Sequence, residues 1–132
     1  MRYFVDTNIF IAALTDEPNR GDVAVDFLNH KADFYTSLLN VMELRSVLGK
    51  KKQLKQERVA ELERRVTSQV EIVVPDASDM LTANKRHQET LLYPMDCLIL
   101  ACAESQDTTL VSFDKELIEA GARSPEEIID ES

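Results

Sequence analysis

The stretch Tyr3-Phe4-Val5-Asp6-Thr7-Asn8, near the start of the chain, sets a pattern that recurs along the rest of the sequence. Its first three residues form a short apolar run, which is typical of a buried strand. Asp6 follows that run directly and is the only charged residue from Tyr3 to Thr15. A helix is expected over Ile9–Leu14. The stretch therefore predicts a buried strand that ends at an isolated carboxylate and leads into a helix.

Three further apolar runs predict strands, at Phe34–Thr36, Ile72–Val74 and Thr109–Val111. Helices are expected around them, over Asp22–His30, Ser37–Gly49, Lys55–Gln69, Asp76–His87, Pro94–Gln106 and Asp114–Ala120. Strands that alternate with helices lie parallel and are joined by crossovers. We therefore expect a single domain over residues 1–132 of the α/β class, built as a three-layer α/β/α sandwich. The acidic tail from Ser124 is expected to add a short strand or to remain loose.

Four acidic residues stand almost alone in apolar surroundings, namely Asp6, Glu43, Asp96 and Asp114. Glu43 is the only charge from Phe34 to Leu44, and Asp96 begins an apolar helix. Asp6 and Asp114 each come shortly after a predicted strand. Charged side chains are seldom buried without a reason. Because functional groups in parallel sheets lie beyond the carboxyl ends of the strands, we expect these acids to converge on one edge of the sheet.

Each of these acids also has a purely structural interpretation. Asp6 and Asp114 are of the residue type that caps a helix, and each precedes an expected helix. Asp96 could serve only as a first-turn acid, which the helix dipole stabilises. For each acid taken singly, the sequence leaves the structural and the functional interpretation open.

Carboxylates that gather at one place repel one another and retain protons near neutral pH. A divalent cation removes that conflict, and oxygen ligands without Cys or His indicate Mg²⁺ or Mn²⁺ and not zinc. Such an ion is suited to in-line attack on a phosphate. The residues alone therefore predict a Mg²⁺- or Mn²⁺-type site for phosphoryl transfer, and they do not identify the substrate as RNA.

The net charge of −9 is unevenly distributed, because one segment runs against the acidic trend. Basic residues outnumber acidic ones over residues 43–65, where they are Arg45, Lys50, Lys51, Lys52, Lys55, Arg58, Arg64 and Arg65. This segment is interpreted either as a solvated helix face or as an edge that contacts phosphates. Glu43 could also pair at the surface with Arg45 or Lys50, which is its structural alternative.

Neither the cysteines nor the apolar runs suggest a secreted or membrane-bound protein. Cys97 and Cys102 lie five positions apart in one expected helix, so we interpret them as small core residues and not as a disulfide or zinc site. No apolar run is long enough to span a membrane. The first residues lack a signal-peptide pattern, because Asp6 interrupts them. A cytoplasmic location is expected.

Four short motifs, in the same order along the chain, resemble those of PIN-domain nucleases. They are Phe4–Asn8, Asn40–Leu44, Asp96–Ala101 and Leu110–Asp114. The resemblance spans about residues 2–117, and within the family it is greatest to the VapC toxins of bacterial and archaeal toxin–antitoxin pairs. The chain departs from the family pattern at Ser112, where Thr is more frequent, and at Leu117, where an aromatic residue often stands.

The resemblance implies a parallel PIN-like sheet, a metal-dependent ribonuclease activity and a set of site residues. The implied residues are Asp6, Glu43, Asp96 and Asp114 as the metal-binding and catalytic acids, with Asn8 and Ser112 as polar neighbours that orient a ligand, water or phosphate. The implied cofactor is Mg²⁺ or Mn²⁺. The implied partners are an RNA substrate such as transfer RNA, a VapB antitoxin and a second copy of the chain.

Two other functions are compatible with parts of this pattern. A non-catalytic PIN-like module could bind RNA or protein without cleaving, although it would have no need of all four acids. A phosphatase-like enzyme could use Asp6 as a covalent nucleophile, but it would require a second Asp where Asn8 stands. An apolar stripe at helical spacing, Val59, Leu62, Val66 and Val70, is interpreted either as core or as part of a groove for an antitoxin helix.

Overall fold

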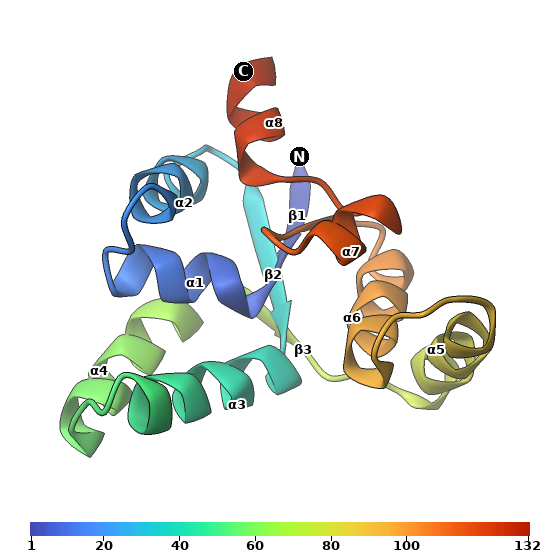
Figure 1. Ribbon diagram of the computed structural model, residues 1–132, viewed down its shortest axis with the longest axis horizontal. Helices are drawn as coiled ribbons and strands as arrows, with labels where there is room; N and C mark the ends of the chain where they lie inside the picture. The colour runs from blue at the N-terminus through green and yellow to red at the C-terminus, as the bar shows by residue number, and fades with distance from the viewer.

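The computed structural model describes residues 1–132 and places a parallel sheet at the centre of the fold (Figure 1). Its strands are β1 (Arg2–Val5), β2 (Asp33–Ser37), β3 (Glu71–Val73) and β4 (Thr109–Val111), in the spatial order β3-β2-β1-β4. β1 lies between β2 and β4, and Phe4 and Val5 are fully buried there. The predicted alternation of short buried strands with helices is therefore confirmed.

Helices cover both faces of the sheet (Figure 1). Their bounds are α1 Thr7–Leu14, α2 Arg20–Leu28, α3 Leu38–Ser46, α4 Gln56–Thr67, α5 Ala77–Glu89, α6 Pro94–Ser105, α7 Lys115–Glu119 and α8 Pro125–Glu131. A π-helical segment, Val47–Lys51, follows α3 directly and ends with Lys50 and Lys51. No helix of this structure combines the length and the apolar character that a membrane span needs.

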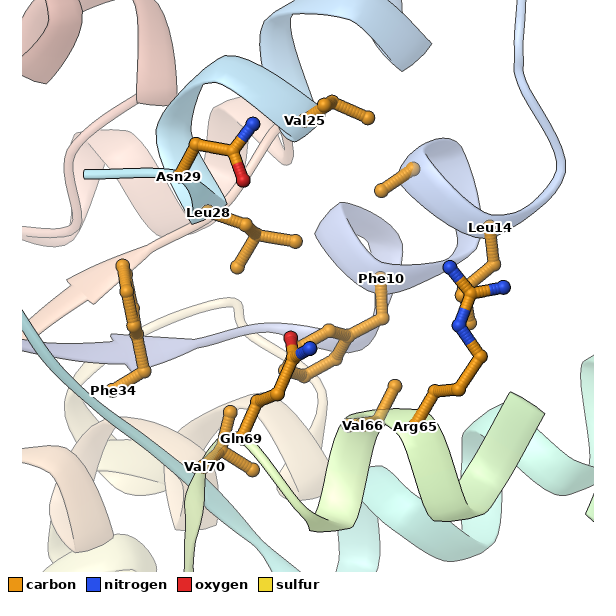
Figure 2. Close-up of a pocket in the computed structure, with 11 residues that line it drawn as sticks. Phe10, Leu14, Val25, Leu28, Asn29, Phe34, Arg65, Val66, Gln69 and Val70 are labelled. Atoms are coloured by element: carbon orange, nitrogen blue, oxygen red, sulfur yellow. The ribbon is translucent and has the colours of Figure 1, made fainter. Parts of the chain in front are cut away.

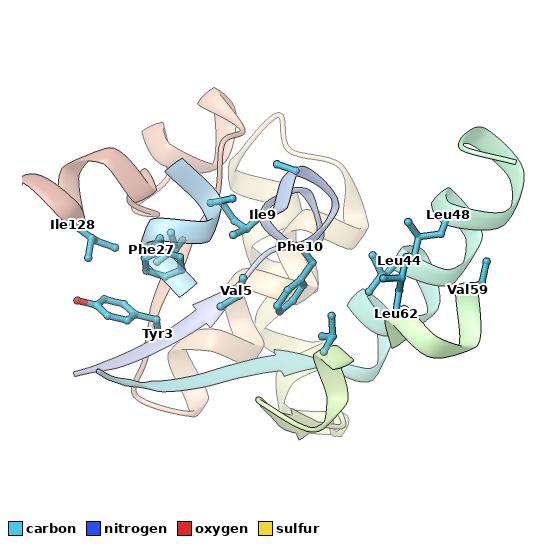
Figure 3. Packing of buried hydrophobic residues seen from close by; sticks show 14 residues of the cluster. Tyr3, Val5, Ile9, Phe10, Phe27, Leu44, Leu48, Val59, Leu62 and Ile128 are labelled. Atoms are coloured by element: carbon cyan, nitrogen blue, oxygen red, sulfur yellow. The ribbon is translucent and has the colours of Figure 1, made fainter. Parts of the chain in front are cut away.

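Successive residues of β1 point to opposite faces of the sheet, which gives the domain two apolar cores. Tyr3 and Val5 pack against α1, α2, α3 and α4 (Figure 3). Phe4 packs on the other face, where α6 contributes more buried side chains than any other element. The three-layer α/β/α sandwich expected from the sequence is thereby confirmed.

The apolar stripe of α4 belongs largely to the first of these cores. Val59, Leu62 and Val66 are buried, so the core interpretation is confirmed for them. Val70, beyond the end of the helix, is only partly buried. Cys97 and Cys102 are buried, unpaired thiols in the second core, as expected for small core residues.

The tail forms a helix, and the expectation of a short strand or a loose segment was wrong. Ser124 caps α8 by accepting a hydrogen bond from the Glu127 amide, and Pro125 occupies the first turn. Ile128 is 3% exposed and packs into the first core beside Phe27, which fastens the helix to the domain (Figure 3). Only Arg123 pairs with the sheet, through a single bridge to Val111.

Candidate active site

Asp6 is a buried carboxylate at the carboxyl end of β1, with 8% of its surface exposed. It caps α1, because its Oδ1 accepts a hydrogen bond of 2.8 Å from the Thr7 amide. Its Oδ2 accepts one of 2.7 Å from the Ser112 hydroxyl. The capping interpretation is therefore correct for Asp6, but it does not explain the second hydrogen bond or the burial of the charge.

Burial raises the pKa of the Asp6 carboxyl from 3.8 to about 6. The hydrogen bonds from Ser112 and Thr7 lower this pKa, while the negative charges of Glu43 and Asp96 raise it. The net effect means that the folded protein holds an uncompensated negative charge at neutral pH. No basic side chain forms an ion pair with Asp6.

Ser112 and Asn8 form a hydrogen-bonded unit beside Asp6. The buried Ser112 hydroxyl accepts hydrogen bonds from Asn8 Nδ2 at 3.1 Å and from the Asp114 amide at 3.0 Å. Asn8 Oδ1 accepts a further hydrogen bond from the Phe113 amide at 3.3 Å. Because these groups use both sides of the hydroxyl, its proton is directed to Asp6. The two residues therefore fix both the carboxylate and the loop that follows β4.

Asn40 is a site residue that the sequence analysis named only as part of a motif. Its side chain is 1% exposed and donates hydrogen bonds to Thr7 Oγ1 at 2.9 Å and to Asp6 Oδ1 at 3.4 Å. Its own oxygen accepts from the amide and hydroxyl of Ser37, in a capping box that begins α3. The spacing Ser37-x-x-Asn40 is a local signal for that cap. Its link to Asp6 depends on the tertiary structure.

Glu43 lies one turn after Asn40 on α3 and is exposed to solvent. The proposed surface pair with Arg45 or Lys50 was wrong, because Arg45 instead contacts Glu63 at 3.5 Å and Lys50 forms no ion pair. The charge of Glu43 raises the pKa of both Asp6 and Asp96. Glu43 is therefore close enough to both carboxylates to act electrostatically on them.

Asp96, in α6, and Asp114, before α7, are the other two acids of the predicted site. Asp96 is half-buried in the first turn of α6, and burial raises its pKa, followed by the charges of Asp114, Glu43 and Glu116. Asp114 caps α7 by accepting a hydrogen bond of 2.9 Å from the Glu116 amide, so its capping interpretation is also correct. Figure 1 shows the first turns of α1, α3 and α6 gathered near the carboxyl ends of the strands.

Glu116 is a fifth acid of this site. Its charge raises the pKa of Asp96, and the sequence analysis overlooked it. Its signal was weak, since an exposed Glu in the first turn of a helix needs no special explanation. The acids provide only oxygen donors and have no basic partner, which fits Mg²⁺ or Mn²⁺. In this arrangement, however, no three Asp, Glu, His or Cys side chains are placed to hold one ion together.

A separate apolar groove of about 540 Å³ opens between α1, α2, β2 and α4 (Figure 2). It is lined mainly by Phe10, Ala13, Leu14, Val25, Leu28, Phe34, Val66 and Val70. Arg65 and Gln69, both exposed, stand at its α4 side. None of the acids named above lines this groove, so it is distinct from the carboxylate site.

Comparison with known proteins relates the chain to one family and to a group of solved structures. The sequence model of the PIN domain matches residues 3–122. No curated protein matches the chain in sequence.

Three of the similar structures belong to toxin–antitoxin systems, and at under 25% identity they show a common fold. VapC20 of Mycobacterium tuberculosis, a sarcin–ricin loop cleaving toxin, has a TM-score of 0.75 and 19% identity over 91% of this chain and 95% of its own. VapBC2 of Rickettsia felis, bound to a promoter DNA fragment, has a TM-score of 0.71 and 20% identity over 94% and 97%. A toxin–antitoxin complex from Klebsiella pneumoniae has a TM-score of 0.70 and 23% identity over 93% and 97%.

Proposed function

Because the chain belongs to the PIN-domain family, we propose that it is a metal-dependent endoribonuclease and the toxin of a toxin–antitoxin pair. The observation that carries the proposal is the buried Asp6, whose charge is left uncompensated among other acids at the carboxyl end of the sheet. A charge of this kind costs stability, and a role in binding a cation accounts for its presence. The fold shared with VapC20, a sarcin–ricin loop cleaving toxin, supports the same function.

In this proposal Asp6, Glu43, Asp96 and Asp114 hold Mg²⁺ or Mn²⁺. When bound, such an ion acts as a Lewis acid that activates water and neutralises charge at the attacked phosphate. The protein contributes orientation, because Ser112 and the Thr7 amide hold both oxygens of Asp6 in place. Asn8 holds Ser112 and the loop after β4, and Asn40 fastens α3 to the same carboxylate.

The basic segment offers a path for the RNA backbone. Its exposed side chains without ion pairs are Lys50, Lys51, Lys52, Lys55, Arg64 and Arg65. Lys50 and Lys51 lie in the π-helical segment that directly follows α3, the helix that carries Glu43. These side chains would form favourable contacts with the phosphates of an RNA such as transfer RNA. Such contacts do not depend on the base sequence.

We further propose that the apolar groove binds a VapB-type antitoxin. Most residues that line the groove are apolar, and Arg65 stands at its α4 side, which suits an amphipathic segment that carries an acidic residue (Figure 2). Similar structures from Rickettsia felis and Klebsiella pneumoniae are toxin–antitoxin complexes, which supports a partner of this class. We expect the chain, its antitoxin and its RNA substrate to be located in the cytoplasm.

Homodimerisation stays a prediction, and the hairpin of α5 and α6 is where it should be tested. Exposed apolar side chains concentrate there, namely Met80, Leu81, Leu91, Tyr93 and Met95. Exposed apolar clusters of this kind mark interaction surfaces. If a second copy covers this face, wild type should be a dimer in analytical ultracentrifugation and Leu91→Glu should be a monomer.

RNA cleavage by the purified protein tests the proposed activity. Wild type is incubated with structured RNA and Mg²⁺ or Mn²⁺, beside an EDTA control and Asp96→Asn. Asp130→Asn, an exposed acid of α8 outside the site, is the matched control. We expect cleavage with 5′-phosphate products by wild type and Asp130→Asn only.

The main alternative is a non-catalytic PIN-like module that binds RNA or protein. The absence of three converging ligands in this arrangement favours it. Equal cleavage by Asp96→Asn would show that the site is misassigned. RNA binding without cleavage on any tested RNA would favour the module.

A further inference from the structure

Arg20 brings a positive charge to the loop that carries two of the site residues. Its guanidinium carbon lies 4.9 Å from the ring centroid of Phe113. Phe113 stands between Ser112 and Asp114, and its amide donates a hydrogen bond to Asn8. The backbone of this loop is therefore tied to Asn8, and the Phe113 ring packs on the first core, so Arg20 contacts the residue that lies between Ser112 and Asp114.

The turn before α2 fixes where Arg20 lies. A Cβ atom at Gly21 would stand 3.1 Å from the Asp16 carbonyl carbon and 3.2 Å from the Ala12 carbonyl oxygen, so the start of α2 packs tightly on the end of α1. Asp16 and Asn19 adopt left-handed φ angles of 49° and 69°, as the sharp turn requires. The close approach and the sharp turn therefore constrain the backbone at Arg20.

The hydrogen-bond donors of Arg20 are not used within the protein. Arg20 is exposed and forms no ion pair, although acidic residues precede and follow it along the chain. A guanidinium that stacks on a ring with its flat face keeps its N–H groups free at the edge. Those groups match the two oxygens of a phosphate.

We propose that Arg20 binds a backbone phosphate of the RNA beside the loop Ser112–Asp114, an inference that rests on the proposed ribonuclease function. RNA must approach a surface that carries at least five acids, and a cation at its rim offsets the repulsion. Arg20 holds the strand in register with the acids through one phosphate contact. Arg20 is thus a substrate-positioning residue that reads no base.

The chain provides a matched control in Arg2. Its guanidinium carbon also lies 4.9 Å from a ring centroid, that of Tyr35, but Arg2 begins β1 at the opposite end of the sheet from the acids. Arg20→Gln and Arg2→Gln therefore each remove one exposed arginine from an aromatic ring. Only the first removal is expected to affect RNA.

Binding of a short single-stranded RNA in EDTA, measured by fluorescence anisotropy over a range of salt concentrations, tests the proposal without any cleavage. Arg20→Gln should weaken binding about tenfold, as expected for a charge-assisted contact. It should also reduce the slope of log K against log salt by about 0.7, the value for one phosphate on a single strand. A merely structural role would lower the melting temperature and leave this slope unchanged.

Two further variants keep the test decisive if Arg20→Gln folds poorly. Arg20→Lys keeps the positive charge but loses the paired N–H donors of the guanidinium. The slope of log K against log salt should therefore stay unchanged, and the RNA affinity should fall about threefold. Phe113→Leu should weaken binding less than Arg20→Gln does. In cleavage assays Arg20→Gln should raise KM and leave kcat within about twofold.

The possible results separate this proposal from the proposed function. Cleavage by wild type together with wild-type binding by Arg20→Gln would overturn the role of Arg20 and leave the nuclease intact. Weakened binding by Arg20→Gln, with no cleavage by wild type, would support the phosphate contact and overturn hydrolysis. Equal losses in Arg20→Gln and Arg2→Gln would reduce the effect to net charge and overturn the specific contact. A wild type that binds no RNA would overturn both proposals.

Discussion

Replacement of Asp6 by Asn is expected to stabilise the folded protein at neutral pH when no divalent metal is present. Burial is the main cause that raises the pKa of Asp6 from 3.8 to about 6. At about 1.4 kcal/mol per pKa unit, this rise corresponds to roughly 3 kcal/mol of folding free energy. Asn resembles the protonated acid in shape and carries no charge, so it removes this cost.

The sign of the pH dependence follows from the direction of the shift. The folded state binds the Asp6 proton more tightly than the unfolded chain does, because the pKa is raised on folding. The cost is therefore absent below about pH 4, grows between about pH 4 and pH 6, and is complete above pH 6. Asn offers one oxygen to the donors from Thr7 and Ser112 where Asp offers two. Allowing about 1 kcal/mol for the weaker contact leaves a gain of about 2 kcal/mol.

Urea unfolding, followed by circular dichroism in EDTA, measures this gain. Asp6→Asn should exceed wild type by about 2 kcal/mol at neutral pH and be about 1 kcal/mol less stable than wild type near pH 4, where only the weaker contact remains. Asp130→Asn, an exposed acid of α8, should follow wild type at both pH values. Added Mg²⁺ or Mn²⁺ should stabilise wild type and not Asp6→Asn. The reasoning is refuted if Asp6→Asn is less stable than wild type by the same amount at both pH values, because Asp6 would then act only as a charged cap.

Three other substitutions probe the rest of the site. Asp96→Asn should abolish cleavage. It should also raise the melting temperature in EDTA, because burial and the charge of Asp114 raise the pKa of Asp96. A lower melting temperature would mark Asp96 as a structural residue. Replacement of Lys50–Lys52 by Gln should weaken RNA binding and flatten its salt dependence, whereas an unchanged slope would exclude this edge as the RNA path. Asn40→Ala should lower the free energy of unfolding by about 1–3 kcal/mol, since it leaves buried partners without hydrogen bonds. Urea unfolding checks this last value, and no loss would mean that water replaces the amide.

Local sequence was sufficient for most of the secondary structure and for the position of the acids. The run that ends at Asp6 and the apolar helix that starts near Asp96 are patterns of a few residues, which the period of the backbone makes readable. Acids that directly follow buried strands must lie at the carboxyl edge of a parallel sheet. The helix that begins after Ser124 was also readable from its cap and proline, but the acidic composition of the tail obscured it.

Tertiary structure decided which side chains meet, because the decisive contacts join residues far apart along the chain. The hydrogen bond from Ser112 to Asp6 spans 106 positions, and that from Asn40 to Asp6 spans 34. No local pattern encodes such distances, so the pairing of Arg20 with Phe113 was also invisible in the sequence, and the apolar stripe near α4 indicated only one wall of the groove. The raised pKa of Asp6 has the same origin, since desolvation depends on what the whole fold packs around a charge. The sequence by itself thus determined that isolated acids follow the buried strands and begin the apolar helix, and only the tertiary structure decided how these acids are held and charged.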